Sequence, residues 1–271
     1  MKERIRHILF HRHLVWEFLR RDLQARYIGS AMGFFWSVVN PLILLLVYTF
    51  VFGYIFRAKY EVMGFDAGGA SPALYIFCGL LPWYALQESL IRSTTCIVDN
   101  AHLIKQVRFP AKVLPFYLTL SSIVNQLIGT AIFLLFLIPL SHKAPISLLA
   151  LPIVFGLEIV LFLGLGLLFA TLNVYLRDIG PLVSIGLMIL MWSAPIFYTL
   201  AMETLQDSRT LQLFIQANPL TYFITIHHKI MLQGVWPSWN HWMILGGIAA
   251  MALALGYWLF TRCHQEFADL I

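Results

Sequence analysis

Long apolar stretches alternate with short polar segments along this sequence. A helix that crosses a bilayer needs about 20 apolar residues, because each residue rises about 1.5 Å and the hydrocarbon core is about 30 Å thick. The stretches that meet this requirement are residues 33–56, 73–97, 114–140, 146–172, 182–200 and 242–260. The second of them contains Pro82, which is expected to kink it. The pattern therefore predicts an all-α integral membrane protein with six transmembrane helices.

Lys and Arg are unevenly distributed between the polar segments. If the six stretches span the bilayer in turn, thirteen of the 18 Lys and Arg residues fall on the side of the N-terminus. They are Lys2, Arg4, Arg6, Arg12, Arg20, Arg21, Arg26, Arg92, Lys105, Arg108, Lys112, Arg177 and Arg262. Because cytoplasmic segments carry an excess of positive charge, both termini are expected in the cytoplasm.

Residues 1–30 are both basic and periodically apolar. The apolar side chains between the arginines are Ile5, Ile8, Leu9, Val15, Phe18, Leu19 and Leu23. The stretch RDLQARYIGSAMGFFWSVVNP, residues 21–41, then leads through Gly29 and Ser30 into the first apolar run. This predicts an amphipathic interface helix lying in the headgroup layer with its cations towards anionic lipid. A basic tail that only fixes the topology would explain the charge equally well.

Three connecting segments have distinct patterns. Residues 98–113, VDNAHLIKQVRFPAKV, predict a short basic helix that ends at Phe109-Pro110. Residues 173–181, NVYLRDIGP, predict a tight charged turn between two long helices. Residues 201–240 are too apolar for an ordinary exposed loop, and they predict short helices that enter the outer leaflet and are separated at Asn218-Pro219.

Composition supports the membrane assignment. The 271 residues are 60% hydrophobic and 11% charged, whereas a soluble domain has about 25% charged residues. These values, with a mean hydropathy of +0.79, exclude an ordinary water-soluble globular domain. A net charge of +5 could suggest nucleic-acid binding, but the basic residues cluster at the N-terminus and in short loops, so nucleic acid is not expected as a partner. Without repeats or linkers, residues 1–271 are expected to form one membrane domain.

The cysteines and the N-terminus add little. Cys78, Cys96 and Cys263 are far apart, without the spacing of a metal site or a disulfide framework, and are expected to act as small apolar side chains. No cleavable signal peptide is expected, because the first apolar run is too long and lacks a small-residue cleavage site.

Ionisable residues within the apolar runs are the first functional candidates, because burying charge in lipid is costly. Glu88 and Arg92 have the i, i+4 spacing of a helical ion pair, which would be either a self-neutralising structural pair or part of a functional site. Glu158 has no partner nearby in the sequence. It could line a wet cavity or form a hydrogen bond across helices.

Several kinds of chemistry lack a sequence signal. His11 and His13 flank an arginine, and His227-His228 precede a lysine, so no metal site is expected. The sequence has no nucleophile elbow and no assembled Ser/His/Asp pattern, so the chain is not expected to be an enzyme. It also lacks G-x-x-x-x-G-K-[ST], so if this protein drives transport with ATP, the nucleotide and its Mg²⁺ must bind to another polypeptide.

Aromatic residues make up 15% of the chain. Flat aromatic faces suit weak, sliding contacts with the apolar faces of sugar rings, although ordinary packing explains each one as well. The candidates for a glycan path are Phe34, Phe35, Trp36, Tyr48, Trp83, Tyr84, Trp192 and Tyr198.

An ordered set of motifs resembles one known family. The motifs are RYIGSAMGFFWSVVNPLILLLVYTFVFGYIF, HLIKQVRFP, VYLRDIGPLV, SAPIFY and NPL…G. From about Arg20 to Gly234 the chain resembles the permease subunit of ABC-2 polysaccharide exporters, which export O-antigen or teichoic acid. The resemblance implies a homodimer with a central channel in the bacterial inner membrane, two copies of a separate ABC ATPase, and a lipid-linked glycan substrate.

The same resemblance assigns roles to the connecting segments. It implies an interface helix at residues 1–30, a coupling helix within 98–113, a second cytoplasmic contact at 173–181 and gate helices within 201–240. The residues expected to couple to the ATPase are Asn100, His102, Leu103, Lys105, Val107, Arg108, Phe109, Arg177 and Asp178. The opposite charges of Arg177 and Asp178 could pair across that interface or merely cap a helix end.

Two kinds of alternative stay open on the sequence. One is an ABC-2 permease for capsule, teichoic acid or a drug. The other is an integral-membrane acyltransferase that acts on lipid-linked sugar, which would need a catalytic His/Asp constellation at a membrane face. A passive channel, which needs no ATPase, is a third reading.

Overall fold

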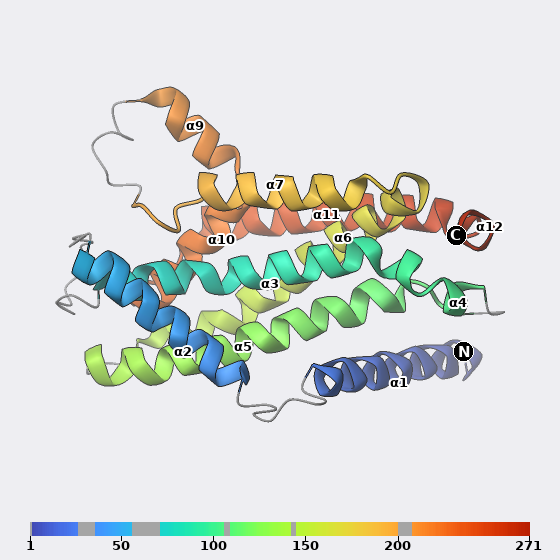
Figure 1. The fold of residues 1–271 in the computed structure, drawn as a ribbon, viewed down its shortest axis with the longest axis horizontal. Helices are drawn as coiled ribbons and strands as arrows, with labels where there is room; N and C mark the ends of the chain where they lie inside the picture. The colour runs from blue at the N-terminus through green and yellow to red at the C-terminus, as the bar shows by residue number, and fades with distance from the viewer. Residues whose placement is uncertain (1, 27–35, 56–70, 106–108, 142–144, 200–207) are drawn as a thin grey trace.

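The computed structural model describes residues 2–26, 36–55, 71–105, 109–141, 145–199 and 208–271. These residues form helices and short connections, with no strand among them (Figure 1). The first half contains α1 (Lys2–Ala25), α2 (Trp36–Tyr48), η2 (Thr49–Ile55), α3 (Ser71–Asp99), α4 (Ala101–Ile104) and α5 (Val113–Ser141). The second half contains η4 (Ile146–Ala150), α6 (Leu151–Tyr175), α7 (Ile179–Ser193), α9 (Arg209–Ala217), α10 (Pro219–His227), η5 (His228–Leu232), α11 (Trp239–Cys263) and α12 (Phe267–Leu270).

Four helices are long and apolar enough to cross a membrane, among the residues described. They are Pro72–Asp99, Val113–Leu140, Ile146–Tyr175 and Trp239–Cys263, which match the second, third, fourth and sixth predicted stretches. The first and fifth predicted stretches contain the shorter apolar helices Leu42–Ile55 and Ile179–Ser193. The all-α membrane architecture is thus confirmed in outline.

The fifth helix ends earlier than the apolar run that predicted it. The run extends to residue 200, whereas α7 ends at Ser193. Ala194 has extended backbone angles, φ −92° and ψ 149°, because Pro195 disfavours the helical conformation for the residue before it. By contrast, α3 continues as a helix through Pro82.

The long helices lie side by side along the long axis of the molecule (Figure 1). Both chain termini, α4 and α12 lie at one end, which we call the terminus end. The opposite end carries α9 and the end of α7. The described parts of the N- and C-terminal regions therefore lie on the same side of the bundle.

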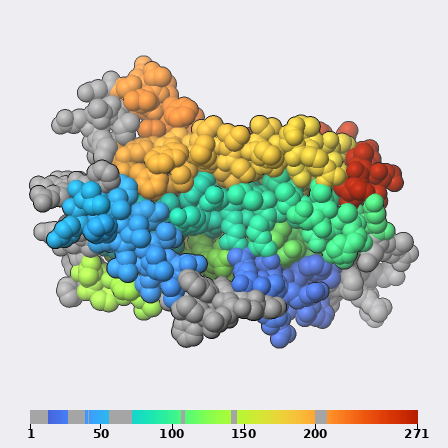
Figure 2. Space-filling model, in the orientation of Figure 1, coloured from blue at the N-terminus to red at the C-terminus, as the bar shows by residue number. Residues whose placement is uncertain are grey.

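The side chains are distributed as in a protein surrounded by lipid. Large apolar side chains are exposed along the outer faces of α2, η2 and α7, for instance Leu46, Phe50, Ile185 and Trp192. These helices lie on the face seen in Figure 2, on either side of α3. The interior instead holds buried polar residues, chiefly Ser and Thr of α3 and α5. Polar side chains buried between helices are common in membrane bundles, where the exterior is as apolar as the core.

Helices α6 and α11 form the most extensive helix pair through two glycines. A methyl group added at Gly256 would lie 1.9 Å from the carbonyl oxygen of Gly164, and one added at Gly164 would lie 2.4 Å from the backbone nitrogen of Leu253. Both positions need glycine because the two backbones are in contact there. Small residues at such crossings let transmembrane helices approach closely.

The segment before α11 contains the break that the sequence predicts. Asn218 ends α9 and caps α10, with its Oδ1 accepting from the backbone N–H of Leu220 at 2.8 Å. Its Nδ2 donates to the carbonyl of Leu190 and to the hydroxyl of Ser193, both at 2.8 Å. These bonds fix α10 to the last turn of α7. Further along, the Ser147 hydroxyl donates to the carbonyl of Ile230 at 2.7 Å.

The glycine contact gives a first prediction. Gly256→Val should prevent α6 and α11 from packing, because overpacking a tight core costs about 1–3 kcal/mol even where the backbone can relax. We expect little monodisperse protein in detergent and a lower thermal midpoint for what remains. Gly246→Val is the matched control, since a methyl group there meets no atom within 4 Å. Equal stability of the two variants would contradict the contact.

Candidate functional site

Four charged side chains meet where α1 docks on α3 and α5. They are Asp22 and Arg26 at the C-terminal end of α1, with Arg26 directly after its last residue, and Glu88 and Arg92 from α3; we call them the four-charge cluster. Each acid contacts both arginines, so two negative and two positive charges balance within the cluster. Glu88 and Arg92 are therefore paired with each other, as their spacing predicts, and also with a second i, i+4 pair on α1.

The cluster is closely hydrogen-bonded. Arg26 donates to Asp22 through Nε at 3.2 Å and to Glu88 through Nη2, and Arg92 Nη1 donates to Glu88 at 3.2 Å. Arg92 holds Asp22 through both of its terminal nitrogens, with Nη1 at 3.1 Å from Oδ2.

Two polar side chains of α5 complete the network. The Ser121 hydroxyl donates to Asp22 Oδ2 at 2.6 Å and lies 2.9 Å from Arg26 Nη2. Asn125 Nδ2 donates to Glu88 Oε2 at 2.9 Å. The cluster thereby joins three helices, α1, α3 and α5.

The Asp22 carboxylate stays charged in this setting. Its burial alone would raise its pKa, but the hydrogen bonds from Arg92 and Ser121 and the positive charges of Arg92 and Arg26 hold the pKa below its usual range. Only 12% of the Asp22 side chain is exposed. A paired carboxylate of this kind stabilises the docked helix at neutral pH.

A groove runs between α1 and the start of the predicted coupling segment. Its volume is about 500 Å³, and it is lined by Phe18, Arg21, Asp22, Gln24, Ala25, Asn100, His102, Leu103 and Tyr117. His102 and Lys105 are exposed beside it, whereas Leu103 is half-buried. Asn100 uses its side-chain amide to donate to the carbonyl of Cys96 at 2.8 Å, at the end of α3.

Phe109 closes the coupling segment against α1. Its ring lies edge-on to Phe18, with centroids 6.1 Å apart, and Phe18 also packs on Tyr117 at 5.3 Å. Between the end of α3 at Asp99 and the start of α5 at Val113, the described residues contain one short helix, α4, and Val107 and Arg108 lie outside the described residues. Part of the Phe109 ring is therefore already covered by this chain.

Arg177 and Asp178 form the second predicted contact. Both are exposed in the turn between α6 and α7, and the start of α7 lies towards the terminus end (Figure 1). Asp178 occupies the N-cap position of α7, but its side chain makes no capping hydrogen bond. The Asp178 side chain is therefore not used to cap α7, and both side chains are exposed on the surface of this chain.

Glu158 is completely buried near the middle of the 30-residue helix Ile146–Tyr175. Gln126 Nε2 of α5 donates to its Oε2 at 2.9 Å, and His227 Nε2 of α10 lies 3.7 Å from its Oε1. The Nδ1 of His227 lies 2.9 Å from the carbonyl of Phe223. Of the two possibilities raised by the sequence, the structure shows the hydrogen bond across helices.

Two of the aromatic candidates, Tyr48 and Trp192, are linked through the rings of Phe52 and Phe197, with successive ring centroids 6.2, 6.1 and 5.2 Å apart. Trp83 is buried in the bundle, whereas Tyr84 and Trp192 are exposed and Tyr48 is half-buried. The hydroxyl of Tyr198 donates to the carbonyl of Ser193 at 2.7 Å. Trp36 is the first residue of α2, and Phe34 and Phe35 lie outside the described residues. Whether any of them contacts a glycan stays a prediction.

A family model matches most of this chain. The family model for ABC-2 type transporters matches residues 13–232, from the middle of α1 to the end of η5. The chain belongs to the ABC-2 type transporter family. The match includes the four-charge cluster, the groove and the buried Glu158, and it ends before α11.

Curated relatives of this ABC-2 chain extend the likeness to its full length. It is 27% identical over 267 residues to the O-antigen export system permease protein RfbA of Myxococcus xanthus, covering 98% of both chains. It is 26% identical over 252 residues to the protein of the same name from Klebsiella pneumoniae, covering 93% of this chain and 92% of the relative. The relatives are named as permeases, that is, as transport subunits.

Several residues of the site were not predicted. Asp22 and Arg26 repeat the acid-then-arginine i, i+4 spacing of Glu88 and Arg92, and that shared spacing is the signal that could have found them. Ser121, Asn125 and Gln126 are uncharged, so a search for ionisable residues passes over them. Nothing near His227 in the sequence indicates that it contacts the buried carboxyl group of Glu158.

The cluster gives a second prediction. Asp22→Asn should weaken the docking of α1 by about 1–3 kcal/mol, because it leaves two arginines short of a charged partner. Thermal unfolding and protease cleavage within α1 would measure the loss. Because the pKa of Asp22 is lowered by folding, its stabilisation is complete above the ordinary value near 3.8 and is lost as the pH falls further. The difference between wild type and variant should therefore persist at pH 5 and shrink below pH 3.8.

Glu17→Gln provides the control for this experiment. Glu17 lies on the same helix and is 4.0 Å from His13, but both side chains are largely exposed. Exposed pairs contribute little, so the control should match the wild type. An Asp22→Asn variant with wild-type stability at pH 7 would contradict the proposed role of the cluster in docking α1.

Proposed function

We propose that this chain is the membrane-spanning permease subunit of an ABC transporter that exports a lipid-linked polysaccharide, most simply O-antigen, across the bacterial cytoplasmic membrane. A separate ATPase subunit would supply the energy. The observation that carries the proposal is the likeness over 98% of the chain to a relative named as an O-antigen export permease. The absence of a phosphate-binding loop from the sequence supports a separate ATPase.

The proposed topology has six spans with both termini in the cytoplasm. The shorter helices α2 with η2 and α7 would be the first and fifth spans, beside the four longer ones. The excess of Lys and Arg in the segments at the terminus end supports this orientation. Helices α9 and α10 would then be the outer gate helices, and two copies of the chain would enclose the channel.

The groove between α1 and α4 is the proposed docking site for the ATPase. It combines the exposed side chains of His102 and Arg21 with the apolar ones of Phe18 and Leu103, and Lys105 is exposed two residues after Leu103. A groove of this kind suits an acidic, apolar-tipped surface on a partner. Arg177 and Asp178 at the start of α7 would form a second contact with the same subunit. Closure of two ATPases on ATP would then move the two bundles as rigid bodies.

A depletion experiment tests the function. Loss of this chain should leave the glycan at the inner face of the membrane, attached to its lipid carrier, with none on the cell surface. Loss of the ATPase should have the same effect, because neither subunit works alone. Surface labelling with a glycan-specific antibody, together with mass spectrometry of the retained lipid-linked glycan, would measure this. Normal surface glycan in the depleted cells would overturn the proposal, as would export by this chain alone in vesicles without ATP.

The docking groove gives a more specific prediction. Lys105→Glu should reduce co-purification of the ATPase several-fold and lower ATP-dependent export by a similar factor, because it reverses an exposed charge two residues after Leu103, which lines the groove. Arg209→Glu is the matched control, since it makes the same charge change on an exposed residue of α9 at the opposite end. Equal co-purification with both variants would place the ATPase contact elsewhere.

A further inference from the structure

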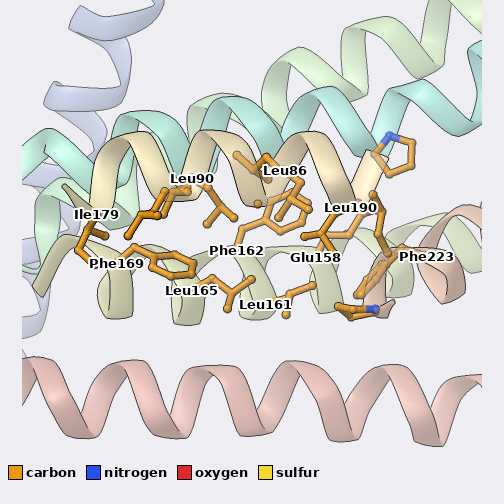
Figure 3. A pocket seen from close by; sticks show the side chains of 17 residues that line it. Leu86, Leu90, Glu158, Leu161, Phe162, Leu165, Phe169, Ile179, Leu190 and Phe223 are labelled. Atoms are coloured by element: carbon orange, nitrogen blue, oxygen red, sulfur yellow. The ribbon is translucent and has the colours of Figure 1, made fainter. Parts of the chain in front are cut away.

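An apolar cavity lies beneath α7, separate from the groove and the four-charge cluster. Its volume is about 420 Å³, and residues of α3, α6, α7 and α10 line it. Figure 3 shows Ile179 and Phe169 at one end and Glu158, Leu190 and Phe223 at the other, with Leu86 and Leu90 from α3 along one wall. Apart from Glu158, every lining residue is apolar.

The cavity has the length of one leaflet of a bilayer. Ile179 and Leu190 are eleven residues apart on α7, which corresponds to about 16 Å of helix, and Glu158 and Phe169 are equally far apart on α6. Half of the hydrocarbon core is about 15 Å thick. The deep end lies at Glu158, near the middle of the span Ile146–Tyr175, and the other end lies where α6 and α7 meet their connecting turn. The cavity therefore runs from mid-membrane to the terminus end.

The wall of the cavity also leaves room for a ligand. Gly186 lies on the same side of α7 as Val183 and Leu190, and a methyl group added there would meet no atom within 4 Å. Cavities lined by Leu, Ile and Phe stay dry and take up apolar molecules. A cavity of this volume at this depth would be filled by hydrocarbon rather than water.

The outer end of the cavity can meet a lipid headgroup. Arg177 is exposed two residues before Ile179, and the first backbone N–H groups of α7 lie at the same place. Arg177 and these N–H groups both favour a phosphate. Asp178, which is exposed between them, repels negative charge, so a phosphate with one negative charge is favoured over one with two. The deep end offers no cation. Its polar group is Glu158, whose Oε1 has no hydrogen-bond partner among the described residues.

From these features we propose that the cavity is a binding site for one acyl chain of a phospholipid in the leaflet at the terminus end, with the lipid phosphate beside Arg177. The acyl chain lies along α7. Its first carbons lie near Ile179 and Phe169, and its methyl end lies near Leu190 and Glu158. It fills the space that side chains leave between α3, α6 and α7. The site does not depend on the glycan, and it stands whether or not the chain exports O-antigen.

Photo-crosslinking of the full-length protein in lipid nanodiscs tests the proposal. The probes are two phosphatidylglycerols that carry a diazirine either near the carboxyl end or near the methyl end of one acyl chain. The first probe should label peptides containing Phe169 and Ile179, and the second should label those containing Leu161 and Leu190. Both should exceed several-fold the labelling of α11, whose outer face is exposed to bulk lipid. Labelling of the cavity no stronger than that of α11, or without dependence on the diazirine position, would overturn the proposal.

A matched pair of variants tests the space itself. Gly186→Trp should fill the cavity and reduce its labelling by at least about tenfold, which corresponds to roughly two methylene groups no longer buried. Gly247→Trp is the control, since Gly247 is exposed on α11 and a methyl group there also meets no atom within 4 Å. Undiminished labelling in a folded Gly186→Trp protein would overturn the site. If that variant does not fold, the dependence of the labelled peptides on the diazirine position in the wild type still tests the proposal.

A competition experiment shows which class of lipid supplies the hydrocarbon chain in the cavity. Unlabelled phosphatidylglycerol in excess should reduce the labelling in proportion to its concentration. Polyprenyl phosphate at the same concentration should leave the labelling unchanged. Displacement by polyprenyl phosphate alone would overturn the phospholipid assignment and give the site to an isoprenoid carrier. Because the readout is a lipid adduct, these outcomes are separate from any result on glycan export.

Discussion

A charge that enters the apolar part of a bilayer must find its counter-charge within the protein, because lipid tails cannot solvate it. The four-charge cluster meets this constraint with two acids and two arginines in mutual contact. Its consequence is architectural: since half of the charges belong to α1, this helix has to stay on α3 and α5. The apolar side chains Val15 and Leu19 are buried in the bundle at the same time, so charge and packing hold α1 in the same place.

The same constraint shapes the interior further along the bundle. Among the described residues Glu158 forms no ion pair with the arginines of the cluster, and its partners are the uncharged Gln126 and the weakly basic His227. One of these partners comes from α10, so the buried carboxyl links α10 to α5 and α6. His228 adds a second link, because its Nε2 lies 3.0 Å from the carbonyl of Tyr75 in α3. Helix α10 is thereby attached to the bundle through polar contacts on several sides.

The predictable part of the fold is the part that follows from periodicity. Apolar runs located the long helices within a few residues, and Asn218-Pro219 located the break between α9 and α10. The spacing of Glu88 and Arg92 predicted their pairing, because residues four apart in a helix are neighbours. The docking of α1 was not predictable, since Asp22 and Glu88 are 66 residues apart and nothing local relates them. The amphipathic pattern of residues 1–30 is equally compatible with a lipid surface or with a protein surface, and the structure shows protein against its last turns.

In the proposed mechanism, the turn between α6 and α7 receives the movement of the ATPase, and α7 leads from this turn to the gate helices α9 and α10. Helix α6 is fixed to α11 by the close contact of Gly164 and Gly256, so it can move only with its partner. Helix α7 is held differently: its last turn is bonded to Asn218, whereas a cavity separates much of its inner face from α6. A force applied at Arg177 and Asp178 would therefore act on the less supported end of α7, and hydrocarbon in the cavity would decide how far that end can shift. In the proposed mechanism, the packing density beneath α7, rather than charge, would set how far a displacement at the terminus end is transmitted along α7 to the opposite end.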